Sequence, residues 1–146
     1  CHTYPEGLPL PHEPRPVVRA SDTARILIVG QAPGTKVHAS GKPFDDRSGD
    51  RLREWMDVTP AVFYDETRIA IAPMGFCFPG QDAKGGDLPP RKECAPLWRG
   101  RLMAELTSLE LVLLVGTPAQ RWHLGPGATR LTDTVRSGPR PLAGAH

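Results

Sequence analysis

The 146-residue sequence is short of cysteine and aromatic residues and contains no long apolar run. No apolar stretch approaches the ~20 residues that a membrane-spanning helix requires, so a helical membrane protein is excluded. The three cysteines are odd in number and widely spaced, unlike the dense, even framework of a small secreted disulfide protein. Because no signal or transit peptide is evident either, we expect a cytoplasmic protein that does not bind membranes.

An excess of charge of one sign is also missing, since 18 Lys+Arg face 16 Asp+Glu and the formal net charge is +2. This balance excludes a polycation that binds nucleic acid through charge alone, but it permits DNA as a partner. Arginine outnumbers lysine 14 to 4, which suits phosphate binding, although a GC-rich genome would produce the same bias. A chain of this length is expected to form one domain, and we expect a monomer.

Short apolar runs that end at Gly or Pro predict strands buried on both faces of a parallel sheet. The predicted strands cover residues 25–30, 67–74 and 111–117. Apolar residues at helical spacing predict three helices, with Ser48 as N-cap of the first and Thr117 as N-cap of the last. The predicted helices cover residues 49–57, 90–106 and 117–122. This alternation favours an α/β fold with a parallel sheet clothed by helices on both faces.

The predicted organisation is one domain with two irregular ends. Residues 1–24 are proline-punctuated and aperiodic, which predicts an extended segment laid over the domain. Residues 25–136 are expected to form the α/β domain. Residues 137–146 are expected to be an irregular tail, because no fourth strand is recognisable there.

The segment from Gly30 to Asp50 carries the strongest functional signal. It is far longer than the usual ~2 to 6 residues of a strand–helix connection, and parallel sheets bind ligands beyond the carboxyl ends of their strands. Its first part, GQAPG, is typical of a loop whose backbone amides approach a base or a phosphate, although such a motif is more often a simple turn.

The second part of that segment, SGKPFDDRSGD, places an aromatic ring beside carboxylates at the start of a helix. A ring next to a carboxylate suits the stacking of a planar base and chemistry at its glycosidic carbon. The alternatives are that Phe44 is a core residue under the loop, that Asp50 complements the helix dipole and that Asp45 is simply solvated.

Four segments together resemble the uracil-DNA glycosylase superfamily, especially its bacterial members that carry an iron-sulfur cluster. These segments are VGQAPGTKVHASGKPFDDRSGDRL, IAIAPMGFCFPG, LPPRKECAPLW and LVLLVGTPAQRWHLG. The resemblance covers residues 7–136 and implies a three-layer α/β/α sandwich with a short, mostly parallel sheet. It also implies hydrolysis of the N-glycosidic bond of a base flipped out of DNA.

The resemblance also implies roles for individual residues. Asp46, in DDRSGD, matches the catalytic carboxylate that some members use, and Gln31 is expected to hydrogen-bond base or water. The expected base-binding residues are Gly30, Gln31, Ala32, Pro33, Gly34, Phe44 and Pro73. Apart from the resemblance, the placement of basic residues on the long loop and near the strand ends gives the expected contacts to DNA phosphates, which are Lys36, Lys42, Arg121 and Arg136.

The chain departs from the superfamily pattern in three places. Ala32 stands where some members carry a water-activating Asp, and Pro73 stands where many have an Asn that reads the uracil edge. The superfamily ends with a fourth strand and a His-Pro-Ser-type loop, whereas this sequence ends RSGPRPLAGAH.

Cysteine placement gives a separate signal for a metal. Judged from the sequence pattern alone, two cysteines spaced like Cys77 and Cys94 are more often buried free thiols than ligands of a cluster. Relatives with a [4Fe-4S] cluster place two ligands in this loop and two near the N-terminus, where Cys1 matches one position. Such a cluster normally requires four thiolates, so one ligand is missing. Zinc held by three thiolates and another ligand is the alternative metal.

The leading interpretation is a monofunctional DNA repair glycosylase that acts on uracil or a related deaminated base in single- or double-stranded DNA. It needs no dissociable cofactor for its chemistry. The second interpretation is a module of the same fold that binds uracil-containing or single-stranded DNA without cleaving it. A third is a nucleotide-binding or nucleoside-processing α/β protein with a similar loop.

Overall fold

The computed structural model describes Leu10 and residues 13–124. Their centre is a parallel three-stranded sheet in the order β2-β1-β3. The strands are β1 (Ile26–Val29), β2 (Ile69–Ile71) and β3 (Leu111–Leu114). In the middle of the sheet Leu27 is in register with Ala70 and Val112. Each strand lies within a predicted run, so the strand predictions are confirmed in place and type.

The observed strands are shorter than the predicted runs, most clearly at β2. The amides of Ala72 and Met74 still donate to the carbonyls of Ile28 and Gly30, at 3.0 and 2.9 Å. Pro73 lies between them and has no amide hydrogen, so regular pairing ends at Ile71.

Helices connect and cover the strands. Their bounds are α1 (Thr35–Ser40), α2 (Arg47–Met56), α3 (Pro60–Phe63), the π-helical turn η1 (Ala95–Arg99), α4 (Gly100–Glu105) and α5 (Thr117–Leu124). The predicted helix over 90–106 starts too early: the helical structure begins at Ala95, where Pro96 occupies the first turn, a position that proline tolerates. The predicted helix over 117–122 is α5, extended to Leu124. The prediction that Thr117 is its N-cap was wrong, because Thr117 is the first helical residue and the carbonyl of Gly116 accepts from the amide of Gln120.

Two short helices lie in segments where no helix was predicted. Helix α1 ends at Gly41, whose φ of 73° gives the left-handed C-cap that glycine favours. Helix α3 starts after Thr59, whose side chain accepts a hydrogen bond from the amide of Val62, and has Pro60 in its first turn. With six and four residues, both are too short for apolar periodicity to reveal them.

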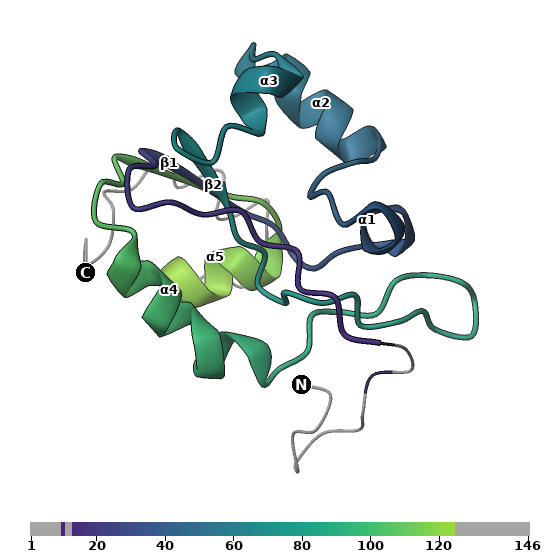
Figure 1. Cartoon of the computed structure of the whole chain (residues 1–146). Coiled ribbons are helices and arrows are strands. Elements are labelled where there is room, and N and C mark those ends of the chain that lie inside the picture. The colour runs from purple at the N-terminus through teal and green to yellow at the C-terminus, as the bar shows by residue number, and fades with distance from the viewer. Residues whose placement is uncertain (1–9, 11–12, 125–146) are drawn as a thin grey trace.

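The sheet separates two apolar layers, as expected for a three-layer α/β/α sandwich. On one face, Leu27 and Val29 belong to a core cluster that includes Leu106 and Ala119, from the side of α4 and α5. On the other face, Ile28 packs in a cluster with Phe63 and residues of α2. Figure 1 shows α2 and α3 on one side of the strands and α4 and α5 on the other. The predicted fold class is therefore confirmed.

The described part of the N-terminal segment lies against β2. Arg19 and Ile71 exchange backbone hydrogen bonds of 2.9 and 2.7 Å in an antiparallel bridge. The amide of Val17 donates to the carbonyl of Phe76 at 2.8 Å, and the Val17 side chain is buried. Cys1, Arg136 and the tail of residues 137–146 lie outside the described residues. None of the helices described in the structure has the length and apolar content to cross a membrane.

Candidate functional site

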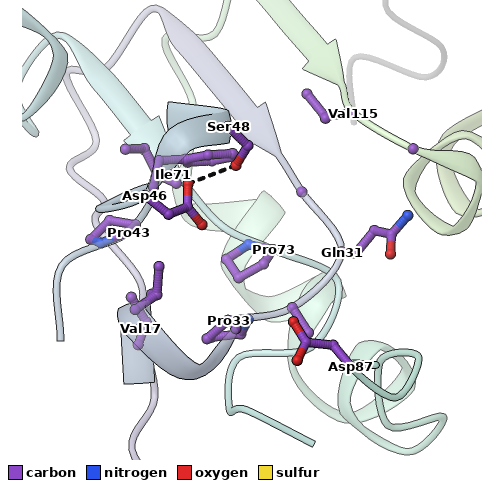
Figure 2. Close-up of a pocket in the computed structure, with 16 residues that line it drawn as sticks. Val17, Gln31, Pro33, Pro43, Asp46, Ser48, Ile71, Pro73, Asp87 and Val115 are labelled. Carbon is purple, nitrogen blue, oxygen red and sulfur yellow. Dashed lines mark hydrogen bonds between the residues drawn. The ribbon is translucent and has the colours of Figure 1, made fainter. Parts of the chain in front are cut away.

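A cavity of about 280 Å³ lies at the carboxyl ends of the strands (Figure 2). It is lined by Val17, Gly30, Gln31, Ala32, Pro33, Gly34, Val37, Pro43, Phe44, Asp46, Ser48, Ile71, Pro73, Asp87, Val115 and Gly116. All of the expected base-binding residues therefore line one cavity. Asp46, the expected catalytic carboxylate, lines the same cavity.

The GQAPG loop forms one wall of this cavity and is tied to the segment after β2. The carbonyl of Gln31 accepts from the amide of Gly75 at 2.8 Å. Within the part of the chain that the structure describes, the amides of Gln31, Ala32 and Gly34 donate no hydrogen bond. Backbone amides without a partner are available to bind a carbonyl group of a ligand.

Phe44 both packs on the core and lines the cavity. Its ring meets the ring of Phe63 edge-on, with centroids 6.1 Å apart. A Cβ atom at Gly30 would lie 3.2 Å from the Phe44 ring, so the ring lies directly over the end of β1. Phe44 has a φ of 57°, which a bulky residue adopts only when its surroundings hold it there.

The backbone around Phe44 is held by two side chains that the sequence analysis did not identify. The Arg53 guanidinium donates to the Phe44 carbonyl at 3.2 Å and to the Tyr64 hydroxyl at 3.0 Å. The Tyr64 hydroxyl in turn donates to the Pro43 carbonyl at 2.7 Å. Burial raises the pKa of Tyr64, which keeps its hydroxyl protonated and able to donate. Neither residue lies in a recognisable motif, because the contacts join residues 9 to 21 positions apart.

Asp46 lines the cavity and also caps α2. Its Oδ1 accepts from the Ser48 hydroxyl at 2.7 Å and from the Gly49 amide at 2.9 Å. The prediction that Ser48 is the N-cap was therefore wrong: α2 starts two residues earlier than predicted, and Ser48 lies in its first turn. The carboxylate of Asp46 satisfies an amide at the helix N-terminus, and a carboxylate there also complements the helix dipole.

Gln31 lines the cavity but is not brought to Asp46. A Cβ atom at Gly116 would lie 2.7 Å from Gln31 Nε2, so the amide group of Gln31 rests against the backbone that follows β3. Gly116 has a φ of 94° and leaves the space that this amide occupies. Figure 2 shows the Gln31 side chain extending away from Asp46. The two predicted catalytic groups therefore lie on different sides of the cavity.

The end of β2 forms the floor and is anchored by a buried arginine. Arg99 is fully buried, and its Nη1 donates to the carbonyls of Ala72 and Pro73 at 3.0 and 3.1 Å. Its Nε donates to Nε2 of His123 at 3.1 Å. Burial lowers the pKa of Arg99 to about 10. Pro73 offers the cavity a ring without a hydrogen-bond donor, so it cannot read a base edge as an Asn would.

Asp87 is a second carboxylate in the cavity that the sequence analysis missed. A Cβ atom at Gly34 would lie 3.0 Å from Asp87 Oδ2, so this carboxylate faces the GQAPG loop. Asp87 directly precedes LPPRKECAPLW, a segment in which the sequence analysis singled out Cys94 as the only site residue. Of the residues that the structure describes, only Asp46 and Asp87 bring a charged side chain to the cavity wall.

The two cysteines in the described residues are buried free thiols. The amide of Phe76 donates to Cys94 Sγ at 3.4 Å, which brings Cys94 against the chain beside Cys77. Burial raises the pKa of both thiols, and repulsion from Cys77 raises the pKa of Cys94 further. Nowhere in Leu10 and residues 13–124 do three or more His, Cys, Asp or Glu side chains gather as a metal site.

The predicted phosphate contacts are dispersed. Lys36 is exposed on α1, and Arg121 is exposed on α5. Lys42 follows α1, and its Nζ lies 4.4 Å from the centroid of the Tyr64 ring. Arg136 is outside the described residues.

Taken together, the parallel sheet and its helices define an α/β protein whose cavity lies beyond the carboxyl ends of the strands, where parallel sheets bind ligands. A family model described as the uracil DNA glycosylase superfamily matches residues 18–145. This match covers most of the chain, and the protein therefore belongs to the uracil DNA glycosylase superfamily. Membership indicates a glycosylase-like function with DNA as the partner.

Proposed function

We propose that the protein is a monofunctional DNA repair glycosylase that hydrolyses the N-glycosidic bond of uracil or a related deaminated base flipped out of DNA. The observation that carries this proposal is that Phe44 and Asp46 line one cavity at the carboxyl ends of the strands. An extruded base needs a face on which to stack, and the sugar behind it needs a negative charge.

The cavity supplies the first of these requirements through Phe44. A flipped base stacks on the part of this ring that faces the cavity, and the amides of Gln31, Ala32 and Gly34 bind a carbonyl of the base. The held backbone of Phe44 favours binding, because little conformational freedom is lost when the base arrives.

Asp46 supplies the second requirement. As the C1′–N bond breaks, its electron pair goes to the base and positive charge develops on the sugar. The carboxylate stabilises this charge and orients a water molecule, whose oxygen bonds to C1′. One proton of that water passes to the carboxylate or to solvent, and the base takes up one proton, which completes the hydrolysis.

The test uses an oligonucleotide with a single uracil, followed by alkali to break the strand at the abasic site. The wild type is expected to give scission. Asp46→Asn is expected to lower it by on the order of 10² to 10³, while an Asn still caps α2 as well as Asp does. Asp45→Asn is the matched control, since Asp45 is exposed and does not line the cavity. Equal scission by wild type and Asp46→Asn would exclude the proposed role.

The capping role of Asp46 favours one alternative, a module of the same fold that binds DNA without cleavage. If the carboxylate of Asp46 served only to cap α2, it would occupy the same place in the cavity wall without taking part in catalysis. Binding of the uracil-containing oligonucleotide without scission by the wild type would support this alternative and exclude the enzyme.

We also propose that Cys1, Cys77 and Cys94 are ligands of a [4Fe-4S] cluster. Cys94 Sγ accepts a hydrogen bond from the amide of Phe76 and lies near the cation of Arg99, and both oppose the burial that raises the pKa of its thiol. The cluster would tie the N-terminal segment to the loop rather than perform redox chemistry. Absorbance near ~400 nm with bound iron, lost in Cys94→Ser, is expected. A colourless protein that contains zinc would exclude the cluster.

A further inference from the structure

Asp87 belongs to a loop that is ordered by its own hydrogen bonds. Gln81 and Asp87 form an antiparallel bridge, and the amide of Leu88 donates to the carbonyl of Gly80 at 2.9 Å. At the tip, Asp82 Oδ1 accepts from the amides of Lys84 and Gly86, both at 2.9 Å. The loop therefore presents Asp87 to the cavity from a defined backbone.

The carboxylate of Asp87 is available to a ligand. No hydrogen bond or ion pair joins it to another residue in the described part of the chain. By contrast, Asp46 is engaged in capping α2. Figure 2 shows Asp46 and Asp87 on opposite sides of Pro73, so the two carboxylates face different parts of whatever fills the cavity.

We propose that Asp87 reads the outer edge of the flipped base and lets the cavity discriminate between deaminated bases, favouring one whose outer N–H has a carbonyl on one side over one whose N–H lies between two carbonyls. This inference rests on the proposed function. If Asp46 lies at the sugar, Asp87 faces the part of the base away from the sugar. Pro73 cannot take this role, because its ring neither donates nor accepts a hydrogen bond.

The selection follows from the chemistry of an ionised carboxylate, which only accepts hydrogen bonds. Uracil presents its outer N–H between two carbonyls, so a carboxylate that accepts this N–H brings an oxygen against a carbonyl oxygen. Hypoxanthine presents an N–H with a carbonyl on one side and a C–H on the other, and the C–H is a weak donor. Asp87 therefore favours hypoxanthine over uracil.

The test compares Asp87→Asn with the wild type on two otherwise identical oligonucleotides, one with hypoxanthine and one with uracil. An amide offers one donor and one acceptor, which complement an N–H beside a carbonyl. The ratio of kcat/KM for hypoxanthine to kcat/KM for uracil is expected to fall about 10-fold or more in Asp87→Asn. Asp22→Asn makes the same charge change before β1, outside the cavity, and should leave the ratio unchanged.

A second measurement separates failure of this inference from failure of the proposed function. Fluorescence anisotropy measures binding of uncleavable 2′-fluoro oligonucleotides that carry either base. If the wild type cleaves neither base, the proposed function fails, and the same shift in the binding ratio still supports Asp87 as the reader of the base. A ratio within twofold of the wild type, or no preference for either base over undamaged DNA, would overturn the inference.

Discussion

The contact between Gly49 and the backbone of Phe44 predicts that a single methyl group displaces the stacking ring. A Cβ atom at Gly49 would lie 1.8 Å from the Phe44 carbonyl oxygen, and real Cβ contacts are essentially never under 3.0 Å. Gly49→Ala must therefore move the start of α2 away from the loop. Because Gly49 also donates to Asp46, this movement weakens the N-cap and shifts both residues of the proposed site.

The cost is worked from two opposing effects. Overpacking of this kind costs about 1 to 3 kcal/mol, whereas alanine is favoured over glycine within a helix by about 0.5 to 1 kcal/mol. A net loss of about 1 kcal/mol lowers the melting temperature by roughly 3 to 4 °C in a domain of this size. Thermal unfolding followed by circular dichroism measures this shift, and the oligonucleotide scission assay is expected to show lower activity.

Gly100→Ala is the matched control for this prediction. Gly100 also begins a helix, but a Cβ atom there would meet nothing within 4 Å. The control is expected to raise the melting temperature slightly, because alanine stabilises a helix at a position without strain. If Gly49→Ala and Gly100→Ala melt at the same temperature, the close approach of α2 to Phe44 is not present in solution.

Three further predictions concern stability and DNA binding. Asp46→Ala should cost about 1 kcal/mol of stability through the lost N-cap, while Asp46→Asn should melt within about 1 °C of the wild type; equal melting of the two variants would contradict the capping role. Burial raises the pKa of Tyr64 above its ordinary 10.0, so stability is retained below pH 10.0 and lost as the pH rises through the raised pKa. Tyr64→Phe should unfold in less urea at neutral pH, because the Pro43 carbonyl loses its donor. Its stability should also fall less steeply with pH above pH 10.0 than that of the wild type, and an unchanged dependence of stability on alkaline pH would refute the role given to Tyr64. Lys36→Ala should reduce the slope of log affinity for DNA against log salt by about 1. Arg68 lies at the amino end of β2, and Arg68→Ala should leave this slope unchanged. Equal slopes for Lys36→Ala and the wild type would show that Lys36 does not contact phosphate.

Much of the fold could be predicted because the relevant signals are local. A run such as RILIVG is apolar throughout and ends at glycine, so it predicts a buried strand without any knowledge of its partners. The meeting of Pro73, after β2, with the GQAPG loop, after β1, was also predictable, since parallel strands carry their following loops to the same edge of the sheet.

The remaining features depend on contacts between distant residues. Asp46 and Ser48 are both good N-caps, and only the position of the Gly49 amide decides between them. Phe44, with its positive φ, accepts a hydrogen bond from Arg53 nine residues away, and Asp87 is paired with Gln81 in an antiparallel bridge. No periodicity or motif encodes such contacts. The sequence therefore predicted Phe44 and Asp46, but not Arg53, which holds the Phe44 backbone, or Asp87, the second carboxylate of the cavity.

Val17 gives the N-terminal segment a part in the cavity as well as in the fold. Its side chain is 2% exposed and forms part of the wall, and its backbone is bonded to Phe76. A shortened protein that started after residue 20 would retain all three strands, but its cavity would lack the part of the wall that Val17 forms. Truncation boundaries for crystallisation or activity work should accordingly be drawn before Val17, even where the sheet alone would permit a later start.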